Sequence, residues 1–352
     1  MTRPSLGALL GTREPLATRY DVALLDLDGV VYLGPQPIPG AADALAAARA
    51  AGMRLAFVTN NASRNPAAVA AHLTELGVPA TVDDVVTSSQ AAATVIAERC
   101  GVGARVLVTG TGALRAAVEQ AGLQIVTSAD DKPDAVVQGY SPELRYADLA
   151  ETALAVRGGA LWVATNVDST LPSARGLLPG NGSLVAAVAL ATGQRPLVAG
   201  KPELPMHAEG VRRTGARNPL VVGDRLDTDI EGAHAADTDS LLVLTGVTDA
   251  ADLIDAPSHH RPTYLSRDLA GLLAPQPDVE VAWAGARCAN WRATAVTSTN
   301  AITVTVDGHG DAVDGLRALL SAAWSAHDAA PGSAATAVTV DAGAALRHLG
   351  FA

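Results

Sequence analysis

Short apolar segments that alternate with helix-type patterns dominate the first three quarters of the chain. Apolar segments lie at 22–25 and 54–58, and helix-type patterns follow them at 41–51 and 66–76. Continuous apolar strands between helices are typical of a parallel sheet covered on both faces. The same pattern returns later as strands at 196–199, 219–222 and 240–244 and helices at 203–214 and 228–236. This alternation predicts an α/β core domain with a Rossmann-like parallel sheet.

The region between these two halves carries an alternation of its own. Its strand-like segments lie at 106–108, 135–137 and 161–164. Because the core pattern stops before this region and resumes after it, we interpret the region as an inserted α/β cap domain. The predicted domains are then a core at 1–87 and 188–274 and a cap at 88–187.

The chain changes character after Pro275-Gln276-Pro277, which is typical of a linker. Beyond it, strand-like segments at 279–283, 301–306 and 337–340 accompany a helix-type stretch at 310–326. We interpret residues 278–352 as a small C-terminal α+β appendage. A segment of this size forms only a small core of its own, so we expect it to pack on its neighbour or on a second subunit.

Charge and composition exclude several classes of function. The chain has 25 Lys and Arg against 36 Asp and Glu, a net charge of −11, which disfavours nucleic acid and anionic membranes as partners. Its two cysteines exclude a disulfide scaffold and a cysteine-rich zinc module. His72, His207 and His234 lie at no metal-ligand spacing, and we interpret them as packing or surface residues. Without a long apolar run or a secretory signal pattern, we expect a soluble, cytoplasmic protein.

Two carboxylates follow the first core strand in the segment Asp26-Leu27-Asp28-Gly29. On an extended backbone, side chains two residues apart point the same way. One carboxylate could attack a phosphorus atom while the other moves protons, and their repulsion implies a divalent cation between them. The alternative is an ordinary turn in which both aspartates bind backbone amides.

A second acidic group follows the strand at 219–222, in the segment from Gly223 to Asp229. Asp224 comes first, at the predicted strand end, where it could bind a cation. Asp227 or Thr228 could cap the following helix, since acids and hydroxyls complement a helix N-terminus. That capping role is also the alternative explanation for the whole cluster.

Neutral and cationic groups follow two other strands. Thr59-Asn60-Asn61 supplies a hydroxyl and amides suited to phosphate oxygens, although such a segment also forms ordinary turns. Lys201 is one of only two lysines, and its compact ammonium could steady a carboxylate and a phosphoryl group together. A surface lysine at a helix start is the alternative. Because ligands gather beyond the carboxyl ends of parallel strands, we expect Asp26, Thr59, Lys201 and Asp224 to share one neighbourhood.

These four motifs, in this order, resemble the haloacid dehalogenase (HAD) superfamily of phosphatases over about residues 18–270. Longer segments narrow the resemblance to the branch with a large α/β cap, which includes NagD-like, 4-nitrophenyl phosphatase, pyridoxal phosphatase and phosphoglycolate or glycerol-3-phosphate phosphatase proteins. These segments begin at Asp26, Thr59, Thr165, Leu178, Gly200 and Gly223. The predicted insertion stands where the cap of that branch belongs.

The resemblance implies hydrolysis of a phosphomonoester through an aspartyl phosphate. Asp26 would be the nucleophile, and Asp28 would protonate the leaving alcohol and then activate water. One oxygen of Asp26, the backbone carbonyl of Asp28 and the side chain of Asp224 would hold Mg²⁺, and Asp229 would orient the metal shell.

The resemblance also implies which residues bind the substrate. The transferring phosphoryl group would be held around Thr59, Asn60, Asn61 and Lys201. Arg64 could contact the substrate or the cap. Asn166 and Asp168, at a cap strand end, could recognise the leaving group; alternatively, their side chains only hold their own loop.

We therefore expect a Mg²⁺-dependent phosphatase that acts on a small phosphorylated metabolite. Glycerol 3-phosphate or a phosphoglycolate-like compound is the first candidate, and pyridoxal phosphate or a nucleotide is the alternative substrate. A phosphotransferase would differ only in the acceptor. A non-enzymatic phosphate-sensing or interaction protein is the alternative class, against which the intact acid pair argues.

The appendage ends in a segment, 345–351, that faintly resembles the end of GNAT-type N-acetyltransferases. No convincing acyl-CoA pyrophosphate loop accompanies it. We expect the appendage to serve domain packing or homodimer formation rather than a second activity.

Overall fold

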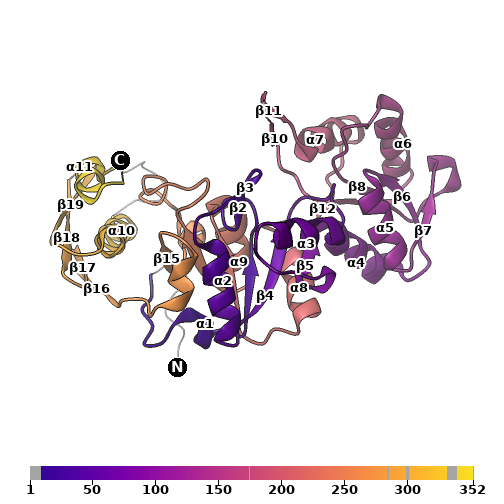
Figure 1. The fold of residues 1–352 in the computed structure, drawn as a ribbon. Coiled ribbons are helices and arrows are strands. Elements are labelled where there is room, and N and C mark those ends of the chain that lie inside the picture. The colour runs from indigo at the N-terminus through magenta and orange to yellow at the C-terminus, as the bar shows by residue number, and fades with distance from the viewer. Residues whose placement is uncertain (1–8, 174, 284, 299–300, 331–338, 352) are drawn as a thin grey trace. The chain divides into compact units, whose positions relative to one another are not determined.

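The computed structural model describes residues 9–173, 175–283, 285–298, 301–330 and 339–351 (Figure 1). The chain forms two compact units. The first unit comprises Met1–Leu55 and Arg217–Ala352, and the second comprises Ala56–Ala216. Among the described helices, none combines the length and the apolar character that crossing a membrane requires.

The first unit is built on parallel strands that run in the order β15-β14-β13-β1. These strands are β1 (Val22–Leu25), β13 (Pro219–Gly223), β14 (Asp239–Val243) and β15 (Tyr264–Ser266). Each pairs in parallel with its neighbour, and β1 is buried along its whole length. The predicted parallel α/β core is confirmed.

Short helices accompany these strands. They are α1 (Leu16–Arg19), α2 (Ala41–Ala50), the π-helical turn η3 (Leu226–Ile230), α9 (Glu231–Ala235), η4 (Ser258–His260) and η5 (Leu269–Leu273). A hairpin of β2 (Tyr32–Leu33) and β3 (Gln36–Pro37) follows the first strand. The single helix expected at 228–236 is in fact the turn η3 followed by the five-residue α9.

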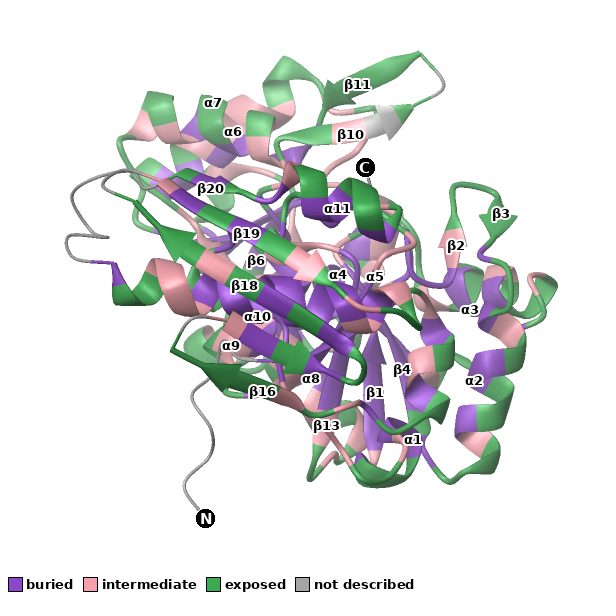
Figure 2. Cartoon of the chain, turned by 90° about the vertical axis from the view of Figure 1, so that its left-hand side faces the viewer, coloured by how far each residue is buried: buried purple, intermediate pink, exposed green. Residues whose placement is uncertain are grey.

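The C-terminal part of the first unit is an α+β domain, as predicted. Its sheet runs β16-β17-β18-β19-β20 and is antiparallel except for the parallel pair β19–β20. The elements are β16 (Val279–Ala282), β17 (Gly285–Cys288), β18 (Trp291–Thr297), β19 (Ala301–Asp307), α10 (Ala312–Ala329), β20 (Thr339–Asp341) and α11 (Gly343–Leu349). Buried and exposed residues alternate along β18 and β19, so one face of the sheet is covered (Figure 2). Residues 337 and 338 of the strand expected at 337–340 lie outside the described residues.

The C-terminal domain packs on the parallel sheet through a shared apolar core. Leu316, Leu320 and Trp324 of α10 belong to the same buried cluster as Leu242 of β14 and Leu265 of β15. The expectation that the appendage packs on its neighbour is therefore confirmed within this unit.

Two arginines complete this interface. Arg317 of α10 donates to the backbone oxygen of Leu265 and, at 2.8 Å, to Oε1 of Gln276. Arg261 forms an ion pair with Asp328 and lies over the ring of Trp324, 5.1 Å from its centroid. Guanidinium groups that bind carbonyls and carboxylates in a buried interface stabilise it and also determine how its two sides are aligned.

The second unit contains a five-stranded parallel sheet, called here the cap sheet, in the order β12-β9-β8-β6-β7. Its strands are β6 (Arg105–Thr109), β7 (Gln124–Val126), β8 (Ala135–Gln138), β9 (Leu161–Ala164) and β12 (Leu197–Val198). The accompanying elements are α4 (Ser88–Cys100), α5 (Gly112–Gln120), η2 (Ala129–Asp131), α6 (Tyr146–Arg157), α7 (Asn181–Thr192) and the hairpin of β10 (Thr170–Ser173) and β11 (Gly176–Pro179).

The rest of the second unit lies before and after the cap sheet in sequence. It consists of β4 (Arg54–Thr59), which begins in the first unit, α3 (Pro66–Glu75), η1 (Val82–Asp84), β5 (Val85–Thr87) and α8 (Leu204–Thr214). β4 and β5 pair in parallel, with Phe57 opposite Val85.

One strand belongs to a different sheet from the one expected. The segment 196–199 was expected to be a core strand, but β12 pairs with β9, with Leu197 opposite Val163, at the edge of the cap sheet. An apolar segment predicts a strand but carries no information on its pairing partner, which is set by contacts far away in sequence.

Replacement of Arg317 by alanine tests the docking of the C-terminal domain. The change removes the donor to Leu265 and leaves Asp314, whose pKa burial raises, without its ion-pair partner. Loss of one partner of a buried polar network costs about 2–4 kcal/mol. We expect Arg317→Ala to lower the free energy of unfolding by this amount in urea titrations followed by circular dichroism. The exposed Arg292 supplies the control, Arg292→Ala, which should change the value by less than about 0.5 kcal/mol; equal effects would refute the assigned role.

Candidate functional site

Three carboxylates gather at the carboxyl ends of β1 and β13. Asp26 follows β1, Asp224 follows β13, and Asp229 lies in η3; each offers an oxygen within 4.8 Å of the other two. The strands are neighbours, with Leu25 opposite Val222, so the first two aspartates come to the same sheet edge. The predicted meeting of the first and last acidic motifs is therefore observed.

Gly29 and Gly246 lie so close to Asp224 that no residue with a side chain could replace either glycine without a clash. A Cβ atom on Gly29 would lie 2.4 Å from Oδ2 of Asp224, and one on Gly246 would lie 1.9 Å from the same atom. Gly29 also has a φ of +86°, which favours glycine in any case. Asp224 itself is fully buried. The two glycines therefore create the space that this carboxylate fills.

Backbone groups from the segment after β14 hold Asp224 in place. The backbone N–H of Val247 donates to Oδ2 of Asp224 at 2.7 Å, and that of Thr248 donates to its backbone oxygen at 3.2 Å. Thr245 Oγ1 donates to the backbone oxygen of Gly29 at 2.5 Å. This segment thus joins Asp224 to the turn that follows β1. Sequence reasoning missed this segment, for which the only signal was a glycine just after a predicted strand.

The π-helical turn η3 brings Asp229 back toward Asp224. The backbone N–H groups of Asp229 and Ile230 both donate to the oxygen of Arg225 at 3.2 Å, and the N–H of Arg225 donates to Oδ2 of Asp229 at 3.2 Å. π-Helical turns often occur at functional sites. Asp227 points elsewhere: its ion pair with Arg225, at 2.8 Å, lowers the pKa of its carboxyl group.

The expected helix cap is not observed at this turn. Neither Asp227 nor Thr228 caps a helix N-terminus with its side chain, because η3 begins after Arg225 and shows no side-chain cap. Because the π-helical turn precedes α9, the α-helix begins at Glu231, later than the sequence pattern indicates.

The donor set fits magnesium. Three carboxylates are hard oxygen ligands of the kind that Mg²⁺ prefers, and their mutual repulsion at this spacing is relieved by a divalent cation. Asp28 lies on the exposed side of the same turn, where its Oδ1 accepts from the backbone N–H of Gly34 at 3.4 Å. Asp26, Asp224 and Asp229 can therefore hold the ion, and the exposed carboxyl group of Asp28 lies two residues from Asp26 in sequence.

In the second unit, the side chain of Asn60 fastens the backbone of Lys201. Asn60 Oδ1 accepts from the N–H of Lys201 at 2.8 Å, and Asn60 Nδ2 donates to the oxygen of Lys201 at 3.1 Å. A Cβ on Gly200 would lie 2.6 Å from Asn60 Oδ1, so glycine permits this approach. The structure brings together Asn60 and Lys201, as predicted, and shows that the side chain of Asn60 positions the lysine backbone.

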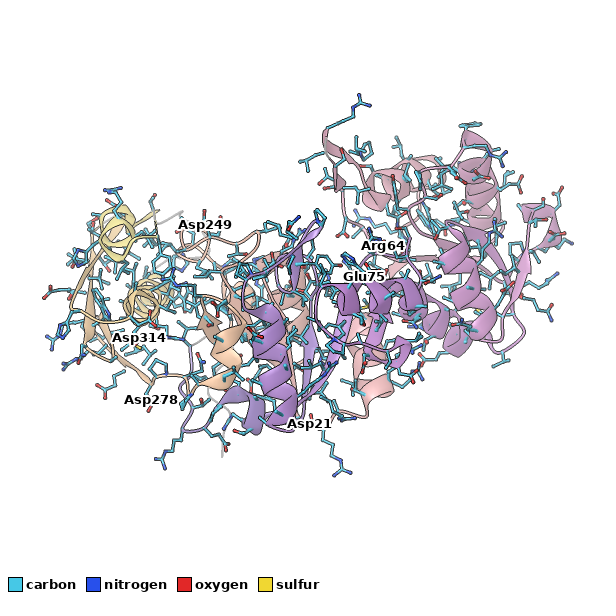
Figure 3. All side chains as sticks on the ribbon, viewed as in Figure 1. Asp21, Arg64, Glu75, Asp249, Asp278 and Asp314 are labelled. Carbon is cyan, nitrogen blue, oxygen red and sulfur yellow. The ribbon has the colours of Figure 1, made fainter. Side chains whose placement is uncertain are left out.

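The other residues of this loop hold its shape. Thr59 Oγ1 accepts from the N–H of Asn61 at 3.1 Å, and Asn61 Oδ1 accepts from Ser63 Oγ at 2.7 Å. Asn65 caps α3 by accepting from the N–H of Ala68. Between them, the side chain of Arg64 is exposed (Figure 3).

Asn166 and Asp168 lie just after β9, where the cap-strand interpretation placed them. Asn166 Nδ2 donates to the backbone oxygen of Asn60 at 2.8 Å, and Asn166 Oδ1 accepts from the N–H of Asp168 at 3.2 Å. Asn181 Nδ2 donates to the oxygen of Asn166 at 2.7 Å. Both ends of the buried Asn166 amide are thus bound to backbone, which favours the alternative that the side chain of Asn166 holds loops in place.

Family models match three parts of the chain. Residues 23–124 match the haloacid dehalogenase-like hydrolase model, and residues 198–272 match a second HAD-hydrolase-like model. Residues 288–351 match a GCN5-related N-acetyltransferase like domain. The GNAT-type resemblance noted for the last residues thus extends over most of the C-terminal domain.

Known proteins resemble the chain over most of its length. D-glycerol 3-phosphate phosphatase of Mycobacterium tuberculosis is 50% identical over 331 residues, which cover 90% of this chain and 89% of the relative. 5'-Nucleotidase YutF of Bacillus subtilis is 38% identical, covering 70% of this chain and 94% of the relative. A crystal structure of a glycerol phosphate phosphatase from Mycobacterium tuberculosis in complex with magnesium has a TM-score of 0.82 at 46% identity and covers 96% of this chain and 99% of that chain.

Replacement of Gly246 by alanine tests the glycine-lined space around Asp224. The new methyl group would lie 1.9 Å from Asp224 Oδ2, so the carboxylate must leave its present place beside Asp26 and Asp229. We expect the Mg²⁺ concentration needed for half-maximal phosphatase activity to rise at least about ten-fold, since lost ligand geometry weakens metal binding by this order. Gly112→Ala is the control, because a Cβ there meets nothing within 4 Å. An unchanged Mg²⁺ requirement in a folded Gly246→Ala protein would contradict the assignment.

Proposed function

Because the chain belongs to the haloacid dehalogenase-like hydrolases and is a Mg²⁺-dependent phosphomonoester hydrolase, we propose that it hydrolyses glycerol 3-phosphate. The carboxylate cluster of Asp26, Asp224 and Asp229 is the observation that carries the phosphatase chemistry. The choice of substrate is supported by the relative named D-glycerol 3-phosphate phosphatase, which is 50% identical over nearly the whole chain. A phosphoglycolate-like compound remains the second candidate.

We propose that Asp26 is the nucleophile. Its carboxylate oxygen forms a bond to phosphorus as the bond between phosphorus and the glycerol oxygen breaks, which leaves an aspartyl phosphate. Asp28 gives its proton to the departing alkoxide, so glycerol leaves as a neutral alcohol. Bound Mg²⁺ supplies charge neutralisation for the carboxylates and the phosphoryl oxygens.

The second displacement regenerates the enzyme. Asp28, now a carboxylate, takes a proton from water as the water oxygen attacks phosphorus. The bond between phosphorus and Asp26 breaks, and inorganic phosphate is released. Division of one hydrolysis into two displacements is the advantage of a carboxylate nucleophile.

We propose that Lys201 and Thr59 hold the phosphoryl group and that Asn60 acts as a positioning residue. The two hydrogen bonds from the Asn60 amide to the backbone of Lys201 support this division of roles. We also propose that Asn61 and Arg64 lie next to the phosphate and that Asp168 contacts the leaving group.

We also propose that residues 88–187, joined by the edge strand β12 of the cap sheet, form the substrate-selecting cap. The rest of 1–87 and 188–274 is then the core, and 278–352 is the appendage. A cytoplasmic location and self-association into a homodimer complete the proposal.

Replacement of Asp26 by asparagine tests the nucleophile. The amide cannot form the phosphoenzyme, so turnover measured as phosphate release should fall at least about 10⁴-fold, the scale of a lost nucleophile. Circular dichroism and the thermal midpoint should show an intact fold. Asp43→Asn, an exposed aspartate on α2, is the control and should retain full activity. Substantial residual turnover in Asp26→Asn would overturn the assignment.

A substrate panel tests the proposed specificity. We expect kcat/KM for glycerol 3-phosphate to exceed that for pyridoxal phosphate, nucleoside 5'-monophosphates and 4-nitrophenyl phosphate at least about ten-fold, since binding energy from the leaving group is used in the transition state. Both enantiomers and phosphoglycolate belong in the panel, with and without Mg²⁺. A higher value for a nucleotide, which the 38% identical 5'-nucleotidase makes the sharpest rival, would replace the proposed substrate and leave the phosphatase assignment intact.

A further inference from the structure

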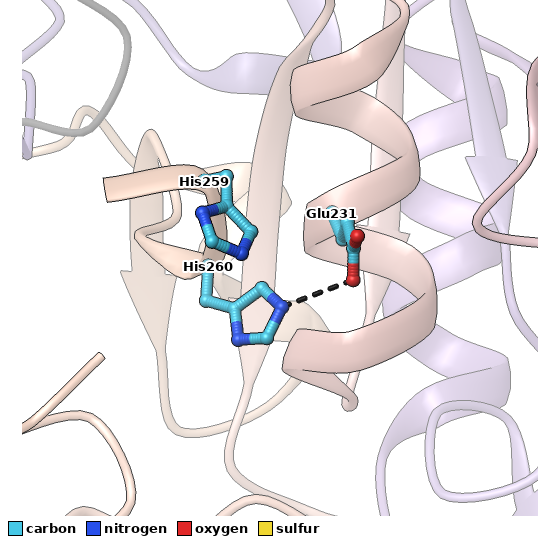
Figure 4. A group of neighbouring side chains, drawn as sticks. All are labelled: Glu231, His259 and His260. Atoms are coloured by element: carbon cyan, nitrogen blue, oxygen red, sulfur yellow. Dashed lines mark hydrogen bonds and ion pairs between the residues drawn. The ribbon is translucent and has the colours of Figure 1, made fainter. Parts of the chain in front are cut away.

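A second group of metal-ligating side chains lies in the first unit, outside the carboxylate cluster. Glu231 begins α9, and His259 and His260 lie in η4; each offers a ligand atom within 4.8 Å of the other two (Figure 4). His260 Nε2 and Glu231 Oε2 are 3.0 Å apart, and the rings of the two histidines have centroids 4.4 Å apart. None of these residues has a part in the proposed hydrolysis.

The separations suit a single metal ion. Zinc binds imidazole nitrogen at about 2.0–2.1 Å and carboxylate oxygen at about 2.0–2.2 Å, so two adjacent ligands of a tetrahedral ion lie about 3.3 Å apart. The 3.0 Å contact between Glu231 and His260 is close to this value. The ligand atoms of all three side chains, held on η4 and α9, already lie within 4.8 Å of one another.

The donor types select a different ion from the carboxylate cluster. Two imidazoles and one carboxylate favour zinc, nickel, cobalt or copper, whereas an all-carboxylate set favours magnesium. The chain would thus carry two sites that differ in the metals they accept. A plain ion pair between Glu231 and His260 is the simpler alternative, but it does not account for the position of His259 beside them.

The surroundings allow an ion to enter. His259 is exposed, and the side chains of His260 and Glu231 are 22% and 38% exposed, so water can complete the coordination.

Other titratable groups lie next to the three residues. His234, one turn along α9, has its ring 6.4 Å from that of His259. The carboxylate of Asp227 also lies near enough for the charge of His260 to contribute to its lowered pKa, after the larger effect of Arg225.

We propose that Glu231, His259 and His260 bind one divalent transition-metal ion of the zinc, nickel, cobalt and copper class. The ion replaces the hydrogen bond between His260 and Glu231 and joins α9 to η4. α9 continues directly from the turn that carries Asp229, so the ion would brace the element next to the carboxylate cluster. The proposal is independent of the phosphatase substrate.

Equilibrium dialysis of the full-length chain against Zn²⁺, with Mg²⁺ in large excess to fill the carboxylate cluster, tests the proposal. We expect one Zn²⁺ per chain that Mg²⁺ does not displace. His259→Gln and His260→Gln should each weaken Zn²⁺ binding at least about ten-fold, because glutamine offers no imidazole nitrogen. His309→Gln, an exposed histidine in the loop before α10, is the matched control and should bind as the natural chain does. Co²⁺ should report the same site by a visible absorption band that both ligand variants lose.

Two results would overturn the proposal. The first is equal Zn²⁺ affinity in the natural chain and in His260→Gln, when circular dichroism shows both to be folded. The second is loss of the bound Zn²⁺ in Asp224→Asn, which would assign it to the carboxylate cluster instead. Neither result bears on hydrolysis of glycerol 3-phosphate, which is measured separately with Mg²⁺ alone.

Discussion

The buried carboxylate of Asp224 is the feature on which the first unit's chemistry depends. Burial of a negative charge beside two other carboxylates costs free energy unless hydrogen bonds and a cation compensate it. The backbone N–H of Val247 supplies one such bond, and the space left by Gly29 and Gly246 lets the carboxylate come this close to the backbone. A side chain on either glycine would force the carboxylate out. The cluster can therefore exist only with these small residues around it, and its remaining charge is what a divalent cation would neutralise.

The C-terminal domain supports the same part of the fold. α10 packs on β14 and β15, and Arg317 binds the backbone of Leu265 in β15. The N–H of Leu244 in turn bonds to the backbone oxygen of Ser266, at the end of β15, and the segment after Leu244 leads directly to Gly246. A continuous set of hydrogen bonds and packing contacts thus runs from the C-terminal domain to the segment that holds Asp224. This supporting role needs no second catalytic activity in that domain.

The sequence predicted what depends on local pattern and missed what depends on pairing. Apolar strands and the acidic motifs after them were predictable, because a parallel sheet brings its carboxyl ends to one edge. The membership of β12 in the cap sheet was not, since nothing in Leu197–Val198 identifies its partner β9. β17 and β18 were missed because their residues alternate between apolar and polar and form no continuous apolar run. The neighbouring histidines His259 and His260 gave no signal, because their carboxylate partner lies on another element.

The charges predict that metal binding and substrate binding depend on each other. The chain has a net charge of −11, and the cluster of Asp26, Asp224 and Asp229 adds a local concentration of negative charge at the sheet edge. A phosphate dianion approaching such a cluster is repelled unless a cation lies between them. The same ion that relieves repulsion among the carboxylates therefore also makes Asp26 accessible to an anionic substrate. Because each ligand lowers the cost of binding the other, their affinities are linked, and we expect Asp26, the proposed nucleophile, to be usable only when the cation is present.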